Sequence, residues 1–208
     1  MAYPGYGQPP QGYNPAGGYA AYPGAQPAGQ PVYPGAAPGG VDPLHGYFSA
    51  VAGSDQQIDA HELQRCLTQS GIAGNYQQFS LDTCRIMIAM LDYDYSGKMG
   101  FQEFKQLWGC LSQWKTTFLQ YDSDRSGTCE PHELYAAIAS FGYRLSPQAL
   151  NIMVKRYSDN GRIAFDNFIS CITRLKTLTE RFQLRDTAKN GMAQFQYDEV
   201  RSAKFPSC

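Results

Sequence analysis

The chain has 208 residues, enough for one or two domains, and its 17 basic and 18 acidic residues leave a net charge of −1. It has no basic tract, so nucleic acid is not an expected partner. No apolar run approaches the roughly 18 residues of a membrane-spanning helix, and the N-terminus lacks the charged and apolar regions of a secretory signal. We therefore expect a soluble, cytoplasmic protein.

Residues 1–41 differ in composition from the rest of the chain. The first 40 residues contain 10 Gly, 9 Pro, 8 Ala and 6 Tyr, and no charged side chain precedes Asp42. Such a segment has no aliphatic periodicity to bury, so chain entropy opposes its folding. We predict a disordered Gly/Pro/Tyr-rich tail over residues 1–41 and one folded unit over residues 42–208.

The folded unit opens with a helix and an incomplete loop. Asp42-Pro43 is typical of a helix start, and apolar residues follow at helical spacing up to Val51. In the next stretch, residues 52–62, Ile58 is followed four residues later by Glu62. This spacing repeats in the two loops that come next along the chain, but here the loop is one residue short and begins with alanine instead of aspartate.

Residues 92–103 and 122–133 are the most informative stretches. Each carries oxygen-bearing side chains at positions one, three and five, glycine at six and glutamate at twelve. This is the EF-hand calcium loop, because Ca²⁺ takes six to eight hard oxygens at roughly 2.3–2.6 Å and the glycine makes the turn that aims alternate groups inward. A backbone carbonyl serves at position seven. The predicted ligands are Asp92, Asp94, Ser96, Lys98 and Glu103 in one loop, and Asp122, Asp124, Ser126, Thr128, Glu130 and Glu133 in the other.

Helical patterns separate these loops. Apolar residues at i, i+3, i+4 and i+7 run over residues 101–118, so one helix should leave the second loop and enter the third. Further patterns cover residues 134–141, 146–154 and 165–182, with Ser146-Pro147 as a helix start. We predict an all-α fold with short β contacts between paired loops.

Two later loops keep the glycine but lose the ligands. A fourth loop starting at Arg156 places a cation at the first ligand position and Asn167 at position twelve. A fifth loop starting at Asp186 has Ala188 at position three and Tyr197 at position twelve. Neither should hold calcium, and both are expected to be structural.

Five such loops after a Gly/Pro-rich tail resemble the penta-EF-hand family, in particular its sorcin and grancalcin branch. The resemblance covers essentially the whole chain, although the polar, proline-containing C-terminus at residues 199–208 departs from the usual apolar helix. It is carried by residues 1–5, 47–53, 63–72, 84–92 and 142–148.

The resemblance implies a third calcium site in the eleven-residue first loop. Its ligands would be the backbone carbonyls of Ala52 and Gln57 and the side chains of Asp55 and Glu62. It also implies a homodimer through the fifth hand, whose strand edge around residues 192–194 has no partner in its own chain, or a heterodimer with a related protein.

These features predict a calcium sensor and adaptor. Calcium would expose apolar surface and send the protein from the cytoplasm to membranes or membrane-bound targets of channel or annexin type. Candidates for that surface are Met87, Met90, Trp108 and Trp114. The alternatives are a cytosolic calcium buffer and a constitutive dimeric scaffold. An enzyme is not expected, because the six cysteines and three histidines show neither C-x-x-C pairs nor zinc-ligand spacing.

Overall fold

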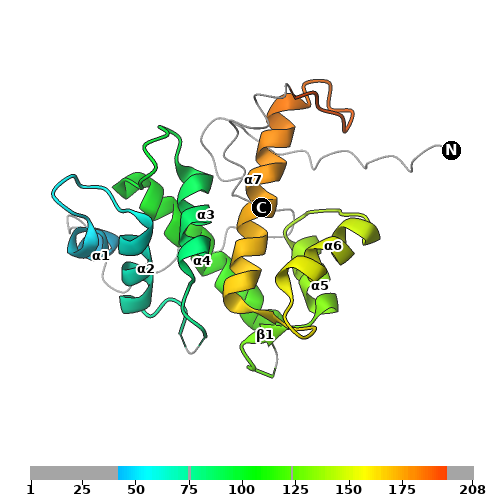
Figure 1. Ribbon diagram of the computed structural model, residues 1–208, viewed down its shortest axis with the longest axis horizontal. Coiled ribbons are helices and arrows are strands. Elements are labelled where there is room, and N and C mark those ends of the chain that lie inside the picture. Colours follow the sequence, from blue (N-terminus) through cyan, green and yellow to red (C-terminus); the bar gives the residue numbers. More distant parts are fainter. Residues whose placement is uncertain (1–41, 75, 123, 196–208) are drawn as a thin grey trace.

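The computed structural model describes residues 42–74, 76–122 and 124–195 (Figure 1). The predicted tail at residues 1–41 and the C-terminal residues 199–208 lie outside the described residues. Within the described ranges, the chain is mostly helical, as predicted. Its elements are α1 (Pro43–Val51), α2 (Ala60–Gln69), α3 (Leu81–Leu91), α4 (Phe101–Tyr121), β1 (Thr128–Cys129), α5 (Pro131–Ser140), α6 (Pro147–Tyr157), β2 (Ile163–Ala164) and α7 (Phe165–Arg185).

The predicted helix starts are confirmed. Pro43 opens α1, and the Asp42 carboxylate accepts the backbone N–H of Leu44 at 3.1 Å. Ser146 caps α6 in the same way, since its hydroxyl accepts the N–H of Ala149 at 3.2 Å. These caps satisfy N–H groups that have no partner inside the helix. None of the helices in the described residues is long and apolar enough to cross a membrane.

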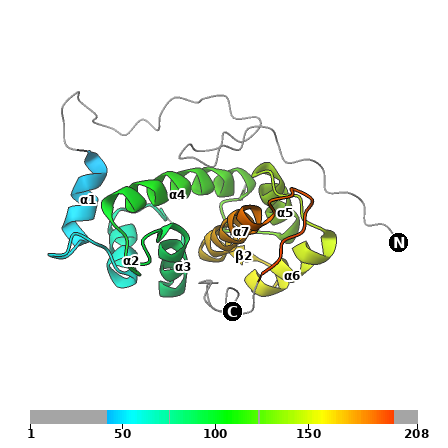
Figure 2. The ribbon, with the colours of Figure 1, turned by 90° about the horizontal axis from the view of Figure 1, so that it is seen from above.

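Helix α4 joins the two ends of the molecule. Figure 2 shows it running from beside α1, α2 and α3 to α5, as predicted for one helix that leaves the second loop and enters the third. Helix α7 packs against α3, α4 and α6. The ring of Phe118 on α4 lies 5.0 Å from that of Phe165 and 5.1 Å from that of Phe168, both on α7. The two long helices therefore share one aromatic core.

The loops pair as predicted. Ile58 and Met99 exchange two backbone hydrogen bonds of 2.8 and 2.9 Å, which ties the first loop to the second. Cys129 lies opposite Ile163 in the antiparallel β1–β2 pair, which ties the third loop to the fourth. All four side chains are buried. Each pair of loops is therefore held in one register by its backbone.

The fourth loop starts later than predicted. Helix α6 continues to Tyr157, so Arg156 lies in its last turn instead of opening the loop. Asp159 and Arg162 then exchange backbone hydrogen bonds of 2.8 and 2.9 Å around Asn160 and Gly161, whose φ angles are 49° and 78°. This is a two-residue hairpin turn of the type with two left-handed residues. An arginine cannot accept the glycine N–H as a first-position aspartate does, and the loop collapses into this tight turn.

Candidate metal centre

The second loop brings three of its predicted oxygen ligands together. Gly97, at φ 74°, donates its N–H to Asp92 Oδ2 at 3.1 Å, and Ser96 donates its N–H to Asp94 Oδ1 at 3.0 Å. The Ser96 hydroxyl lies 3.4 Å from Asp92 Oδ1 and 3.2 Å from the Lys98 carbonyl oxygen. Oxygens of positions one, five and seven therefore face one another.

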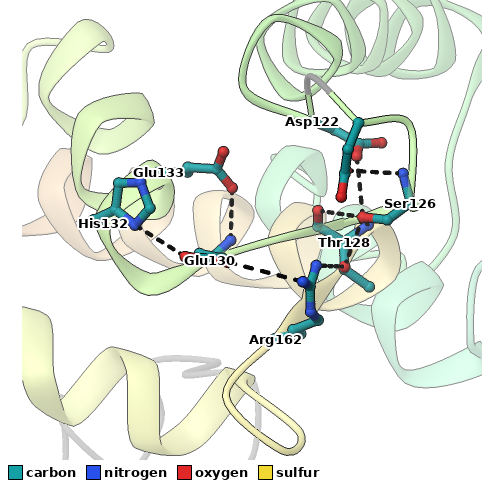
Figure 3. A network of polar contacts seen from close by, with 8 residues as sticks. Asp122, Ser126, Thr128, Glu130, His132, Glu133 and Arg162 are labelled. Carbon is teal, nitrogen blue, oxygen red and sulfur yellow. Dashed lines mark hydrogen bonds and ion pairs between the residues drawn. The ribbon is translucent and has the colours of Figure 1, made fainter.

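The third loop repeats this geometry (Figure 3). Gly127, at φ 79°, donates to Asp122 Oδ2 at 3.1 Å, and the Ser126 N–H donates to Asp124 Oδ1 at 3.1 Å. The Ser126 hydroxyl lies 3.3 Å from Asp122 Oδ1 and 3.2 Å from the Thr128 carbonyl oxygen. Two loops of different sequence have thus reached the same arrangement.

The chemistry of these donors fits a hard divalent cation. A serine hydroxyl has one proton, so it cannot donate separate hydrogen bonds to both the first-position carboxylate and the seventh-position carbonyl that lie beside it in each loop. One of these two contacts sets two oxygens against each other without a proton between them, and a cation among them would relieve the repulsion. Asp122 is only 1% exposed, and the described residues give it hydrogen bonds but no ion pair. A buried carboxylate calls for such a positive charge, and an all-oxygen donor set favours calcium.

The glutamates at position twelve lie at the helix starts. Glu103 accepts the Gly100 N–H at 2.8 Å and the Tyr93 N–H at 3.4 Å, so it bridges the two ends of the second loop. Glu133 accepts the Glu130 N–H at 2.7 Å. Among residues 42–74, 76–122 and 124–195, no three His, Cys, Asp or Glu side chains lie close enough together to hold a metal. Closing either site with carboxylates requires its glutamate to turn inward.

In the first loop, the side chains of two predicted ligands lie near Gly53. Asp55 Oδ1 and Glu62 Oε1 stand 3.5 and 3.9 Å from the point that a Cβ on Gly53 would occupy. At Ala52 the backbone leaves the helix (φ −63°, ψ 128°), which takes its carbonyl out of the helical ladder. The Gln57 N–H donates to Asp55 Oδ1 at 3.2 Å. Residues 52–62 therefore form a compact turn around the two carboxylates.

Asp55 has a further partner that the spacing of the loop residues did not predict. The Lys98 ammonium, from the second loop, lies 2.5 Å from Asp55 Oδ2. This hydrogen bond lowers the pKa of Asp55 and raises the pKa of Lys98. Lys98 entered the prediction only through its backbone carbonyl. Its basic side chain directly before the bridging residue Met99 was the available signal.

Glu130 faces other residues than predicted for position nine. Its Oε1 lies 3.8 Å from Arg162 Nη2, and its Oε2 lies 3.4 Å from His132 Nδ1 (Figure 3). Arg162 also donates to the Thr128 hydroxyl at 3.2 Å. The carboxylate of Glu130 is thus oriented toward the fourth loop.

The fifth loop keeps the turn of a calcium loop but lacks ligands at positions three and twelve. Asp186 accepts the N–H groups of Gly191 at 2.8 Å and Asn190 at 3.0 Å, and Asn190 accepts the Met192 N–H at 3.0 Å. Position three is Ala188, which has no side-chain oxygen. Tyr197, at position twelve, lies outside the described residues.

Known proteins share this arrangement. Residues 54–109 match the family model of an EF-hand domain pair. Human sorcin is 55% identical over 201 residues, with 96% of each chain covered. The chain belongs to the sorcin and grancalcin branch of the penta-EF-hand family. Mouse grancalcin is 50% identical over 220 residues, again with 96% of each chain covered.

Two more distant matches agree with this assignment. Bovine calpain small subunit 1 is 39% identical over 155 residues, which are 72% of this chain and 57% of that protein. The solved structure of a homolog of programmed cell death 6 protein from Leishmania major Friedlin aligns with a TM-score of 0.59 at 25% identity, over 79% of this chain and 90% of that one. The chain is therefore a calcium-binding penta-EF-hand protein with the helical fold described above.

Proposed function

We propose that this protein is a calcium sensor and adaptor. It binds Ca²⁺ through the first three of five hands, exposes apolar surface and associates reversibly with membranes or membrane-bound targets of channel or annexin type. The observation that carries the proposal is the repeated oxygen geometry of the second and third loops at the two ends of α4. The ligands proposed are those predicted above: Ala52, Asp55, Gln57, Glu62, Asp92, Asp94, Ser96, Lys98, Glu103, Asp122, Asp124, Ser126, Thr128 and Glu133, with Glu130 near the third site.

Helix α4 connects two of the proposed sites. Gly100 is the N-cap of this helix, Glu103 lies in its first turn, and Asp122 caps its last turn by donating its N–H to the Phe118 carbonyl at 2.8 Å. Inward movement of Glu103 or a shift of Asp122 therefore acts on an end of the same helix. Because α4 also packs on α1, α5 and α7, its displacement would shift the helices in both halves of the molecule.

The predicted apolar surface lies mostly in the core. Met87, Met90 and Trp114 are buried, and half-buried Trp108 stacks on Tyr47 with ring centroids 5.7 Å apart and planes 17° apart. These side chains can reach a target only if helices move. A sensor must therefore show such movement on binding calcium, whereas a buffer need not.

We also propose a homodimer through the fifth hand, or a heterodimer with a related protein. The end of α7 and the loop after it project away from β1 (Figure 1) and expose a group of apolar side chains. Three of them, Phe182, Leu184 and Met192, line one open groove. Leu184 and Met192 are 73% and 70% exposed, and a second chain would cover them.

The proposal assigns no catalytic residue. Burial raises the thiol pKa of Cys84, Cys129 and Cys171 to about 12, so these thiols stay protonated at neutral pH. A protonated, buried thiol is a poor nucleophile.

The test is calcium titration by calorimetry, with a hydrophobic-surface dye, on wild type and Glu133→Ala. Asn167→Ala, at the equivalent position of the fourth loop, is the matched control. We expect micromolar binding with dye uptake, both blunted by Glu133→Ala and unchanged by Asn167→Ala. Tight binding without dye uptake would make the protein a buffer. No binding would refute the sites.

Association with membranes has its own test. Vesicles of phosphatidylcholine and phosphatidylserine, with and without an embedded membrane-protein fraction, are pelleted with the protein in calcium or EDTA. We expect pelleting only in calcium and less of it for Glu133→Ala. Equal pelleting in calcium and EDTA would contradict a calcium-driven relocation from the cytoplasm.

A further inference from the structure

The side chain of Lys98 forms an ion pair with a carboxylate that the first calcium site needs. Its ammonium lies 2.5 Å from Asp55 Oδ2, while Asp55 Oδ1 and Glu62 Oε1 both lie within 4 Å of the point that a Cβ on Gly53 would occupy. Lys98 and Asp55 are 43 residues apart in sequence, and both side chains are partly exposed, at 42% and 45%. The contact is thus a tertiary one, made on a proposed metal ligand.

The backbone register places Lys98 there. Lys98 directly precedes Met99, whose two hydrogen bonds with Ile58 hold the first and second loops side by side. Asp55 stands three residues before Ile58. Because this bridge fixes the separation of the two loops, the lysine reaches Asp55 without any rearrangement of the backbone.

The other pair of loops repeats the relationship. Arg162 directly precedes Ile163, which pairs with Cys129, and its guanidinium reaches Thr128 and Glu130 of the third loop (Figure 3). In both pairs, a basic side chain just before the bridging residue lies over the partner loop. The two pairs differ in the carboxylate that the basic side chain contacts. Asp55 is a proposed direct ligand of calcium, whereas Glu130 stands outside the set of oxygens that face one another in the third loop.

We propose that Lys98 is a built-in competitor for the first calcium site, so that calcium can use Asp55 fully only after displacing the ammonium. The inference rests on the proposed calcium binding by the first loop. The same residue serves the second site through its carbonyl and opposes the first through its side chain. Because an exposed ion pair is weak, its removal should tighten the first site by roughly two- to fivefold.

The test follows the amide NMR signals of Gly53, Gly97 and Gly127, one in each loop, during calcium titration of the full chain. Lys98→Met removes the charge, and Lys98→Arg keeps it. Lys105→Met is the matched control, because Lys105 pairs with Asp42 at 2.8 Å outside the loops and its loss changes the net charge equally. We expect the Gly53 signal to respond at two- to fivefold lower calcium in Lys98→Met alone.

A second readout follows the Lys98 ammonium itself, first without calcium and then with it. Acetylation of Lys98 in EDTA, followed by mass spectrometry, should be faster in Asp55→Asn than in wild type, and in wild type it should accelerate when calcium is added. Identical Gly53 midpoints in wild type and Lys98→Met, or equal acetylation rates, would overturn the competitor role alone. A Gly53 signal that responds in no variant would overturn the first calcium site as well.

Discussion

The ring of Tyr76 meets the ring of Phe118 edge to face, with the two planes 79° apart. Tyr76 lies in the segment between α2 and α3, yet its ring packs against Phe118 and Phe165, with centroids 5.2 and 4.9 Å away. Burial, followed by the interaction of its hydroxyl with the Asp122 carboxylate, raises the pKa of Tyr76 to about 12. The first half of the chain thereby places a phenol near the leading ligand of the third loop.

Removing the Tyr76 hydroxyl should destabilise the protein. Tyr76→Phe takes a polar group away from the neighbourhood of buried Asp122, and we expect a loss of about 1 kcal/mol in the free energy of unfolding. Tyr135→Phe is the control, because its hydroxyl makes an exposed hydrogen bond of 3.0 Å to Asn151. Urea denaturation in EDTA measures both. Equal losses for the two variants would contradict a special role for the Tyr76–Asp122 contact.

The two loop glycines should differ in their tolerance of a methyl group. Gly97 and Gly127 have left-handed φ angles of 74° and 79°, so alanine at either position costs about 1–2 kcal/mol. A Cβ on Gly127 would also stand 3.2 Å from Tyr76 Cδ1, whereas one on Gly97 meets nothing within 4 Å. We expect Gly127→Ala to cost about 1 kcal/mol more.

Thermal or urea unfolding of both glycine variants in EDTA tests this difference. Tyr76→Ala clears the space beside Gly127, so in that background the extra cost of Gly127→Ala over Gly97→Ala should be smaller. If Gly97→Ala proved as costly as Gly127→Ala, the packing of Tyr76 on the third loop would be loose.

The buried thiols should react slowly with alkylating reagents. The pKa of Cys84, Cys129 and Cys171 is about 12 because of burial, whereas an unfolded thiol has a pKa of about 8.5. At pH 8 the thiolate is then rarer on the order of a thousandfold, so peptide mapping after iodoacetamide should show slow labelling of all three. Rapid labelling of Cys129 at pH 8 in the folded protein would refute its burial.

The same thiols make stability depend on alkaline pH. The folded state holds its thiol protons more tightly than the unfolded state, so their contribution is complete below the unfolded pKa of about 8.5. It is lost as pH rises through that value toward the folded pKa of about 12. Urea midpoints should therefore fall above pH 9. Cys129→Ala and Cys171→Ala, each referenced to its own stability at pH 7, should show a shallower decline.

A charge in the fifth-hand groove should dissociate the proposed dimer. Leu184 is 73% exposed, so Leu184→Glu leaves the fold intact but buries a carboxylate at the interface, and we expect the dimer dissociation constant to rise at least about tenfold. Ile152→Glu, at a 60% exposed position on α6, is the matched control. Sedimentation velocity at micromolar concentration measures both. If the wild-type chain sediments only as a monomer, the proposed dimer is wrong.

Much of the fold could be read from local pattern. Helix caps predicted the starts of α1 and α6, and apolar periodicity predicted the continuous helix α4. The apolar residue four positions before the closing glutamate marked where the loops make their short β contacts. Each of these signals depends on residues that are close together in the sequence, so it can be recognised without the tertiary structure. The start of the fourth loop did not follow from counting, because Arg156 continues α6 where an aspartate would have stopped it.

The amino-acid order alone was sufficient for the positions of the candidate ligands, because an EF-hand loop orients its oxygens by the spacing of residues around one left-handed glycine. It could not say which distant side chains would meet those oxygens. Lys98 on Asp55, Arg162 on Glu130 and Tyr76 on Asp122 join separate segments. Those contacts exist only once β bridges and helix packing have set the loops side by side, since charge and hydrogen bonding act across space and leave no periodic trace along the chain.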